Sequence, residues 1–348
     1  MSTAVLGSTV GLIAAGRARR GARRRLILAV LSILVVAMFA TALMVGQSVT
    51  SPGDVLRVIL GERVEGASFT VGVLRLPRAV QAIVGGASFG LGGIAFQIML
   101  RNPLASPDII GINLGASAAA VFAIVVLQLS GPAVSLFAIS MGLAVALAIY
   151  ALAFKGGVVG TRLILMGIGV SAMLQSVISY LLLKAPSWDW QEAVRWLTGS
   201  LNGSTWAGVL PALAALVVFG GLLLSRARDL DALRLGDDAA AALGVRVGLT
   251  RIVIMVAAVG LIAFATAATG PIAFAAFLAG PIAARIVGRH GSLLLPAALV
   301  GALMVLVADF LGQFALGVRY PVGVVTGALG APYLIYLIVR SHRGGGSL

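Results

Sequence analysis

Residues that could take part in chemistry are concentrated in one polar segment of this chain, residues 226–251. The segment reads RARDLDALRLGDDAAAALGVRVGLTR and mixes acids with bases more densely than any other stretch beyond the N-terminal arm. Long apolar stretches flank it on both sides. Because charged side chains are costly inside a bilayer, we expect this segment to lie in water, where it can contact another molecule.

The polar segment also carries the signals of a short helix. Gly236, Asp237 and Asp238 precede the apolar run at 239–243, and Gly244 follows it. Acids in a first turn interact favourably with the helix dipole, and glycine is preferred just beyond a helix end. The pattern predicts a helix of about two turns, too short to be stable alone in water. Such a helix could dock in a groove on a soluble partner, and an ordinary connector helix is the alternative.

Several kinds of catalytic and cofactor chemistry lack the residues they need. The chain has no cysteine, which excludes disulfides, iron–sulfur clusters and thiolate zinc sites. His290 and His342 lie apart from any carboxylate cluster, so no metal centre is expected. No GxxxxGK[ST] phosphate loop occurs, and the only lysines, Lys155 and Lys184, stand in AFKGG and LLKAP. We therefore expect no enzymatic activity and no cofactor in this chain.

Asp309 is the only acid that falls well inside a predicted apolar span. Such an aspartate can pair with a neighbouring polar group or can serve a function directly. Carriers coupled to protons or sodium usually show several intramembrane carboxylates. A single acid without a relay partner gives little support to secondary transport.

The composition predicts an all-α polytopic membrane protein. Of the 348 residues 60% are hydrophobic and 10% are charged, which leaves more apolar surface than a soluble protein of this size can bury. The apolar runs continue over about 20 residues without period-two alternation, which favours helices over a β-barrel. Reading these runs between turn signals predicts about ten transmembrane helices. They lie near 26–46, 79–99, 109–129, 132–154, 163–183, 207–225, 250–269, 271–287, 293–317 and 322–339.

The distribution of basic residues predicts the orientation. Residues 1–25 form a basic arm, residues 26–340 a single transmembrane domain and residues 341–348 a tail. With both termini in the cytoplasm, most of the 25 basic residues fall on the cytoplasmic side, together with the polar segment. This topology, rather than nucleic-acid binding, accounts for the net charge of +14. On the outer side, the tryptophan-rich loop predicts a short surface helix from about Trp188 to Leu197.

Five ordered motifs carry a family resemblance. They are RLPR at 75–78, Gln97 with RNPLA at 101–105 and Pro107, Gly111 and Gly115, LGDDAAAALGV at 235–245, GPIAF at 270–274, and PVGVVT at 321–326 with GAP at 330–332. With these motifs the chain resembles the FecCD-type permeases of ABC importers for iron–siderophore complexes, haem and cobalamin. The resemblance runs from about Pro52 to Arg340.

The resemblance implies a type II ABC importer permease fold with ten spans. It implies an assembly in the bacterial cytoplasmic (inner) membrane. The partners would be a second permease, either a non-identical homologue or an identical copy, two cytoplasmic ATPases that bind ATP and Mg, an extracytoplasmic substrate-binding protein, and membrane lipid. Nucleic acid is not an expected partner. The coupling residues facing the ATPase would be Leu235, Gly236, Asp237, Asp238, Ala239, Ala240, Ala241, Leu243 and Gly244.

On the outer side, the resemblance favours Arg75, Arg78 and Arg319 as contacts for carboxylates of the binding protein. The alternative for Arg75 and Arg78 is that they anchor a span at the lipid headgroups. Two positions depart from the family. The chain reads Gly280-Pro281 where many relatives carry Pro-His, and Arg319 stands where relatives often carry an acidic or neutral residue.

The transport pathway is expected along the interface of two permeases. Gln97, Ser171 and Gln175 are candidates to line it, and each could instead make an interhelical hydrogen bond. The function expected is that of a permease subunit of an importer for a ferric siderophore or similar metal chelate. The alternatives are a cobalamin or haem importer permease, an ATP-independent secondary transporter, and a membrane scaffold.

Overall fold

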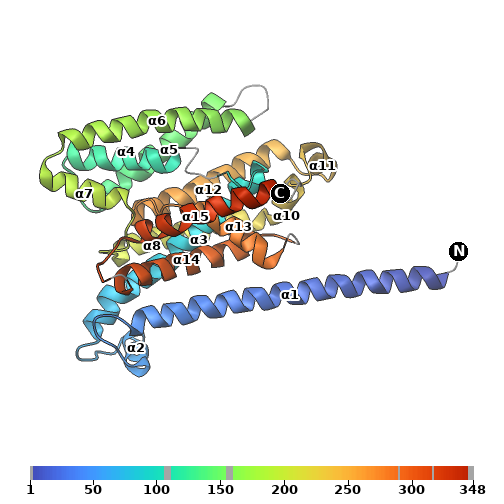
Figure 1. The fold of residues 1–348 in the computed structure, drawn as a ribbon, viewed down its shortest axis with the longest axis horizontal. Coiled ribbons are helices and arrows are strands. Elements are labelled where there is room, and N and C mark those ends of the chain that lie inside the picture. Colours follow the sequence, from blue (N-terminus) through green and yellow to red (C-terminus); the bar gives the residue numbers. More distant parts are fainter. Residues whose placement is uncertain (1–2, 106–110, 154–159, 289–290, 316, 344–348) are drawn as a thin grey trace.

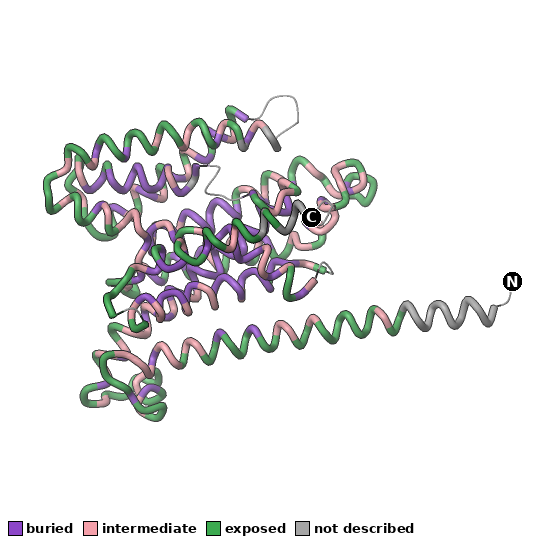
Figure 2. Tube along the Cα trace, in the orientation of Figure 1, coloured by how far each residue is buried: buried purple, intermediate pink, exposed green. Residues whose placement is uncertain are grey.

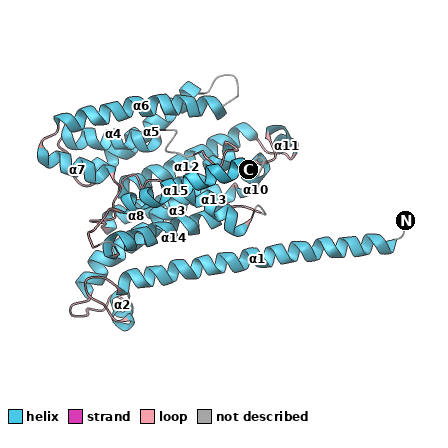
Figure 3. Ribbon diagram, viewed as in Figure 1, coloured by secondary structure: helices cyan, strands magenta, loops and turns pink. Residues whose placement is uncertain are grey.

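The computed structural model describes residues 3–105, 111–153, 160–288, 291–315 and 317–343, and within these ranges the regular structure is helical, with no strand (Figure 3). Pro107, Lys155 and His290 lie outside the described residues. The elements, which include the two π-helical segments η1 and η2, are α1 (Thr3–Met44), α2 (Pro52–Ile59), η1 (Ser68–Arg75), α3 (Leu76–Met99), α4 (Ile112–Val125), α5 (Pro132–Ala153), α6 (Gly160–Lys184), α7 (Ser187–Leu197), α8 (Trp206–Ala215), η2 (Leu216–Gly220), α9 (Gly221–Ser225), α10 (Ala227–Leu233), α11 (Asp237–Ala242), α12 (Val247–Thr269), α13 (Ala275–Val287), α14 (Leu294–Phe314) and α15 (Val322–Arg343).

Seven helical stretches of the described chain are long and apolar enough to cross a membrane. Three further apolar helices, at 113–125, 275–287 and 322–336, are shorter. Together the ten stretches fall at the positions of the ten predicted spans. The structure thus confirms an all-helical membrane protein, while the count of about ten crossings stays a prediction.

Helix α3 lies at the centre of the molecule and is buried over almost its whole length (Figure 2). Its glycines explain how neighbours come so close. A Cβ on Gly90 would lie 2.2 Å from the carbonyl oxygen of Ala297 in α14, and one on Gly86 would lie 2.4 Å from that of Gly301. In lipid, helices associate through such close packing of small residues. The small faces of α3 therefore serve helix packing, as the sequence indicates.

The outer parts of α4–α7 form a second packing unit beside the α3 core. A separate cluster of buried residues, including Val121, Ala138, Ile178 and Ala193, holds these four helices together. Figure 1 shows them as a group at one side of the ribbon. Helix α7, Ser187–Leu197, confirms the predicted surface helix.

Helix α1 continues without a break through the basic arm and the first span. Its N-terminal end projects well past the other helices (Figure 1). The side chain of Arg24 reaches back to the bundle, where Nη2 donates a hydrogen bond to the backbone oxygen of Ser292. The basic arm is therefore helical and fastened to the loop before α14.

Candidate functional site

The polar segment 226–251 folds into two short helices, α10 and α11, followed by the start of α12. Helix α11 runs from Asp237 to Ala242, with the two aspartates in its first turn as the sequence predicts. Gly236 before it and Gly244 after it have φ of +112° and +87°, conformations that glycine adopts without the steric cost of a Cβ. The predicted short helix is confirmed.

Asp237 joins α11 to two other parts of the permease. Its Oδ1 accepts a hydrogen bond from Arg101 Nη2 at 2.6 Å and another from Arg251 Nη2 at 2.9 Å. Arg101 follows α3 in the RNPLA segment and has the unusual φ of +50°, and Arg251 lies in the first turns of α12. Each exposed ion pair is weak by itself, but together they fix the orientation of α11 against the helix bundle.

Several residues in and beside α11 are exposed. Leu235 and Leu243, which flank the helix, are 67% and 66% exposed. Asp238, Ala241 and Gly244 are exposed as well, whereas Ala240 is buried. The predicted coupling residues thus divide into an inner set led by Asp237 and an exposed set that includes Asp238. We call this exposed set, Leu235, Asp238, Ala241, Leu243 and Gly244, the α11 surface.

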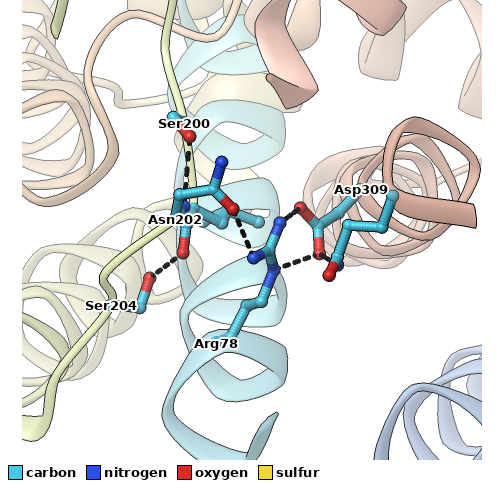
Figure 4. Close-up of polar contacts among 7 residues, drawn as sticks. Arg78, Ser200, Asn202, Ser204 and Asp309 are labelled. Atoms are coloured by element: carbon cyan, nitrogen blue, oxygen red, sulfur yellow. Dashed lines mark hydrogen bonds and ion pairs between the residues drawn. The ribbon is translucent and has the colours of Figure 1, made fainter. Parts of the chain in front are cut away.

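On the other side of the molecule, Arg78 is engaged within the chain. Its guanidinium donates to both carboxylate oxygens of Asp309, with Nε–Oδ2 2.8 Å and Nη2–Oδ1 2.7 Å, and its Nη1 donates to Asn202 Oδ1 (Figure 4). Gln313 also donates to Asp309 Oδ2 at 2.8 Å. Asp309 thus pairs with a neighbouring polar side chain, one of the two possibilities that the sequence leaves open, and the pair connects α3 to α14.

Arg75 is also directed inward. Its Nη1 donates to the carbonyl oxygens of Leu43 and Met44 at 2.9 and 3.0 Å, and its Nη2 donates to that of Ser48 at 2.7 Å. Of the three arginines predicted to dock the binding protein, Arg319 is the exposed one. The guanidinium groups of Arg75 and Arg78 hold the ends of helices together, and docking of a binding protein on the three arginines stays a prediction.

The three pathway candidates lie in different surroundings. Gln97 is 4% exposed and its Nε2 donates to the carbonyl oxygen of Phe277 at 2.9 Å, so it makes an interhelical hydrogen bond. Ser171 is half-buried, and its hydroxyl has no hydrogen-bond partner among the described residues. Gln175 is exposed and lines a cavity of about 760 Å³. The structure therefore favours Gln175 over Gln97 as a residue of an open surface.

We call this space the Gln175 cavity. Asn113 and Ser117 of α4, Phe277 of α13 and Leu334 of α15 contribute to its walls, as does Phe274. Phe274 has φ of +60° immediately before α13, a left-handed conformation that is unfavourable for a bulky residue. Strained residues of this kind cluster at functional sites. In the sequence, only the GPIAF motif indicated this loop, and it did not indicate the left-handed conformation of Phe274.

Comparison with known proteins places the chain in a family. The model of the FecCD transport family matches residues 33–340. The ferric enterobactin transport system permease protein FepG of Escherichia coli (strain K12) is 39% identical over 302 residues, covering 86% of this chain and 91% of that protein. The achromobactin transport system permease protein CbrC of Dickeya dadantii (strain 3937) is 39% identical over 316 residues, or 89% and 90% of the two chains.

A solved structure supports the same assignment. An inward-facing conformation of a metal-chelate type ABC transporter superposes with a TM-score of 0.81 at 27% identity, covering 90% of this chain and 99% of that one. Sequence, fold and motif order therefore agree over nearly the whole length. This integral membrane protein belongs to the FecCD transport family.

Proposed function

We propose that the chain is a permease subunit of an ATP-driven importer that carries a ferric siderophore or a similar metal chelate into a bacterial cell. The relatives described above are permeases of ferric enterobactin and achromobactin systems, which supports this substrate class. The complex would sit in the cytoplasmic membrane with both termini of this chain inside. The metal chelate is cargo, selected mainly by a separate binding protein.

One observation carries the proposal for energy coupling: α11 is fixed to the bundle through Asp237, while several residues in and beside it are exposed. A separate ATPase that binds ATP and Mg would dock on the α11 surface, where Leu235 and Leu243 provide apolar contacts beside Asp238. Movement of the ATPase would pass through Asp237 to Arg101 after α3 and to Arg251 in α12. The side chains thus connect the docking surface to two membrane helices.

A second permease would pack against the exposed apolar faces of α6 and α15. Met173 and Leu183 of α6 are 70% and 81% exposed, and Ile335 of α15 is 63% exposed. The Gln175 cavity lies between these two helices and α4 and α13. A pathway there would present mostly apolar walls with a few amides, a surface to which a bulky chelate adheres weakly.

The binding protein would dock on the outer side. Arg319 supplies an exposed positive charge for a carboxylate of that partner. Arg75 and Arg78 would support the same surface indirectly, because they hold the residues around it in place. Cobalamin or haem remains the alternative cargo within the same transport mechanism.

The test is uptake by the reconstituted complex. The chain is co-expressed with its ATPase, second permease and binding protein, and uptake of a radiolabelled iron chelate into proteoliposomes is followed. Uptake that requires ATP and the binding protein supports the proposal. Uptake that proceeds without ATP and stops with a protonophore would instead establish a secondary transporter.

A further inference from the structure

A second cavity, also of about 760 Å³, lies among α3, α5, α7, α8 and α12. None of its lining residues belongs to the Gln175 cavity. Most of its wall is apolar, and the apolar lining includes Ile124, Val134, Leu136, Ile139, Pro211 and Phe264. Asn202, which accepts a hydrogen bond from Arg78, also lines it. We call it the α7 cavity.

The side chain of Gln81 marks the α7 cavity as a binding site. Gln81 stands one turn after Arg78 on α3 and is only 1% exposed. Neither its Nε2 nor its Oε1 has a hydrogen-bond partner among the described residues. A buried amide left unsatisfied costs about 1–3 kcal/mol. A ligand that offers a carbonyl oxygen to Nε2 would satisfy the donor and remove part of that cost.

The rim of the cavity combines an aromatic side chain with two opposite charges, all on α7. Trp188 is 82% exposed, and Glu192 and Arg195 are exposed one turn apart. No ion pair within 4.0 Å links Glu192 or Arg195 to another described residue. Exposed tryptophans are typical of the headgroup level of a membrane. Glu192 and Arg195 are thus available to pair with a lipid headgroup that carries one positive and one negative charge.

The helices on either side of the cavity carry exposed apolar side chains. Leu136 of α5 is 66% exposed, and Leu210 and Val217 on the α8 side are 57% and 67% exposed. In a bilayer such side chains contact acyl chains. The cavity therefore lies between two lipid-facing helices, with its polar rim on the surface helix α7.

We propose that the α7 cavity binds one outer-leaflet phospholipid with a zwitterionic headgroup. The phosphate pairs with Arg195, the ammonium group with Glu192, and a glycerol ester carbonyl accepts a hydrogen bond from Gln81 Nε2. One acyl chain follows the wall formed by Leu136, Ile139 and Phe264. Because a lipid tail gains little by leaving one apolar environment for another, the polar contacts provide the selectivity.

The experiment measures lipid retention by native mass spectrometry of the purified chain. The detergent-extracted protein is titrated with phosphatidylethanolamine or phosphatidylglycerol, and bound lipid is counted. We expect one phosphatidylethanolamine to bind more tightly than phosphatidylglycerol. In Gln81→Leu the affinity should fall about fivefold, the effect of one lost hydrogen bond.

A cavity-filling variant separates the site from the general lipid belt. Gly208 belongs to the cavity lining, and a Cβ added there meets no atom within 4 Å, so Gly208→Phe should occupy part of the space and abolish tight binding. Gly221→Phe is the matched control, since Gly221 also has open space at its Cβ but lies outside the lining. Equal lipid retention by all four proteins, or equal affinity for both headgroups, would overturn the proposal.

Discussion

The guanidinium of Arg78 and the carboxylate of Asp309, 231 residues apart in the chain, form a two-point ion pair at 2.7 and 2.8 Å. Their side chains are 18% and 10% exposed. Removing one partner of such a pair leaves the other charge poorly compensated in a largely buried position. The pair therefore fixes the first turn of α3 against α14.

Neutralising this pair should destabilise the protein. We expect Arg78→Gln or Asp309→Asn to lower the free energy of unfolding by about 3 kcal/mol, the usual cost of breaking a buried pair. Thermal unfolding in detergent measures it. Arg319→Gln is the control and should leave the unfolding temperature unchanged, because Arg319 is exposed. An unchanged unfolding temperature for Asp309→Asn would contradict a structural role for the pair.

Charge reversal at Arg319 should act on docking instead. Arg319→Glu is expected to weaken binding-protein affinity and mainly to slow association, because exposed charges steer encounter. Surface plasmon resonance against the reconstituted permease complex measures both. The effect should shrink at high salt. Association rates that match the unaltered protein at low salt would remove Arg319 from the docking surface.

Gly280 and Gln97 give a packing prediction. A Cβ at Gly280 would lie 2.1 Å from Gln97 Oε1, and Gln97 is held by its hydrogen bond to Phe277. Gly280→Ala should therefore destabilise the protein by about 1–3 kcal/mol, as overpacking does. Gly248→Ala is the control, since its Cβ meets nothing within 4 Å. If both variants unfold at the temperature of the unaltered protein, the close approach of α3 and α13 at this point is wrong.

Asp231 in α10 predicts a pH dependence. Burial raises the pKa of its carboxyl above 3.8, against the opposing effect of the cations Arg234 and Arg24. The folded state then binds this proton more readily than the unfolded state, so stability falls as the pH rises from 3.8 through the raised pKa, and it recovers as the pH is lowered. In Asp231→Asn, the unfolding temperature should not show this fall as the pH rises. If the unfolding temperatures of the unaltered protein and Asp231→Asn change with pH in the same way, the prediction is wrong.

The sequence was informative where signals are local. Gly236, the aspartates and Gly244 predicted α11, and the tryptophan-rich loop predicted α7, because caps and amphipathic spacing act within a few residues. Hydropathy located all ten apolar stretches. Two of them are shorter than the runs suggest, since the helices of 112–125 and 275–287 begin only after Gly111 and Phe274, both with positive φ.

The side-chain contacts between residues distant in sequence could not be predicted from the sequence. The pairing of Arg78 with Asp309 was not predicted, because the two residues lie 231 positions apart and nothing local indicates their contact. Asp237 and Asp238 looked equivalent, although only Asp237 turns toward Arg101 and Arg251. Gln97 and Gln175 are the same residue type, but Gln97 is buried between helices and Gln175 lines an open cavity. Pairings of this kind depend on how helices distant in sequence pack together.

The contrast between the two aspartates tests the coupling path. Asp237→Lys should retain the ATPase on the complex but lose substrate-dependent stimulation of ATP hydrolysis, because the new ammonium group faces Arg101 and Arg251. Asp238→Lys changes the α11 surface and should weaken ATPase association instead. ATPase assays and co-purification measure the two effects. Identical behaviour of the two variants would argue against the division of α11 into inner and exposed sets.

The central claim is that energy from a separate ATPase enters through the α11 surface. The most direct measurement is ATP-driven uptake of the radiolabelled iron chelate into proteoliposomes by complexes carrying Leu243→Asp, compared with Leu249→Asp, an equally apolar and 50% exposed position outside α11. We predict that Leu243→Asp loses ATPase association and uptake while the permease keeps its unfolding temperature, and that Leu249→Asp retains both. Full ATP-driven uptake by Leu243→Asp would contradict the claim.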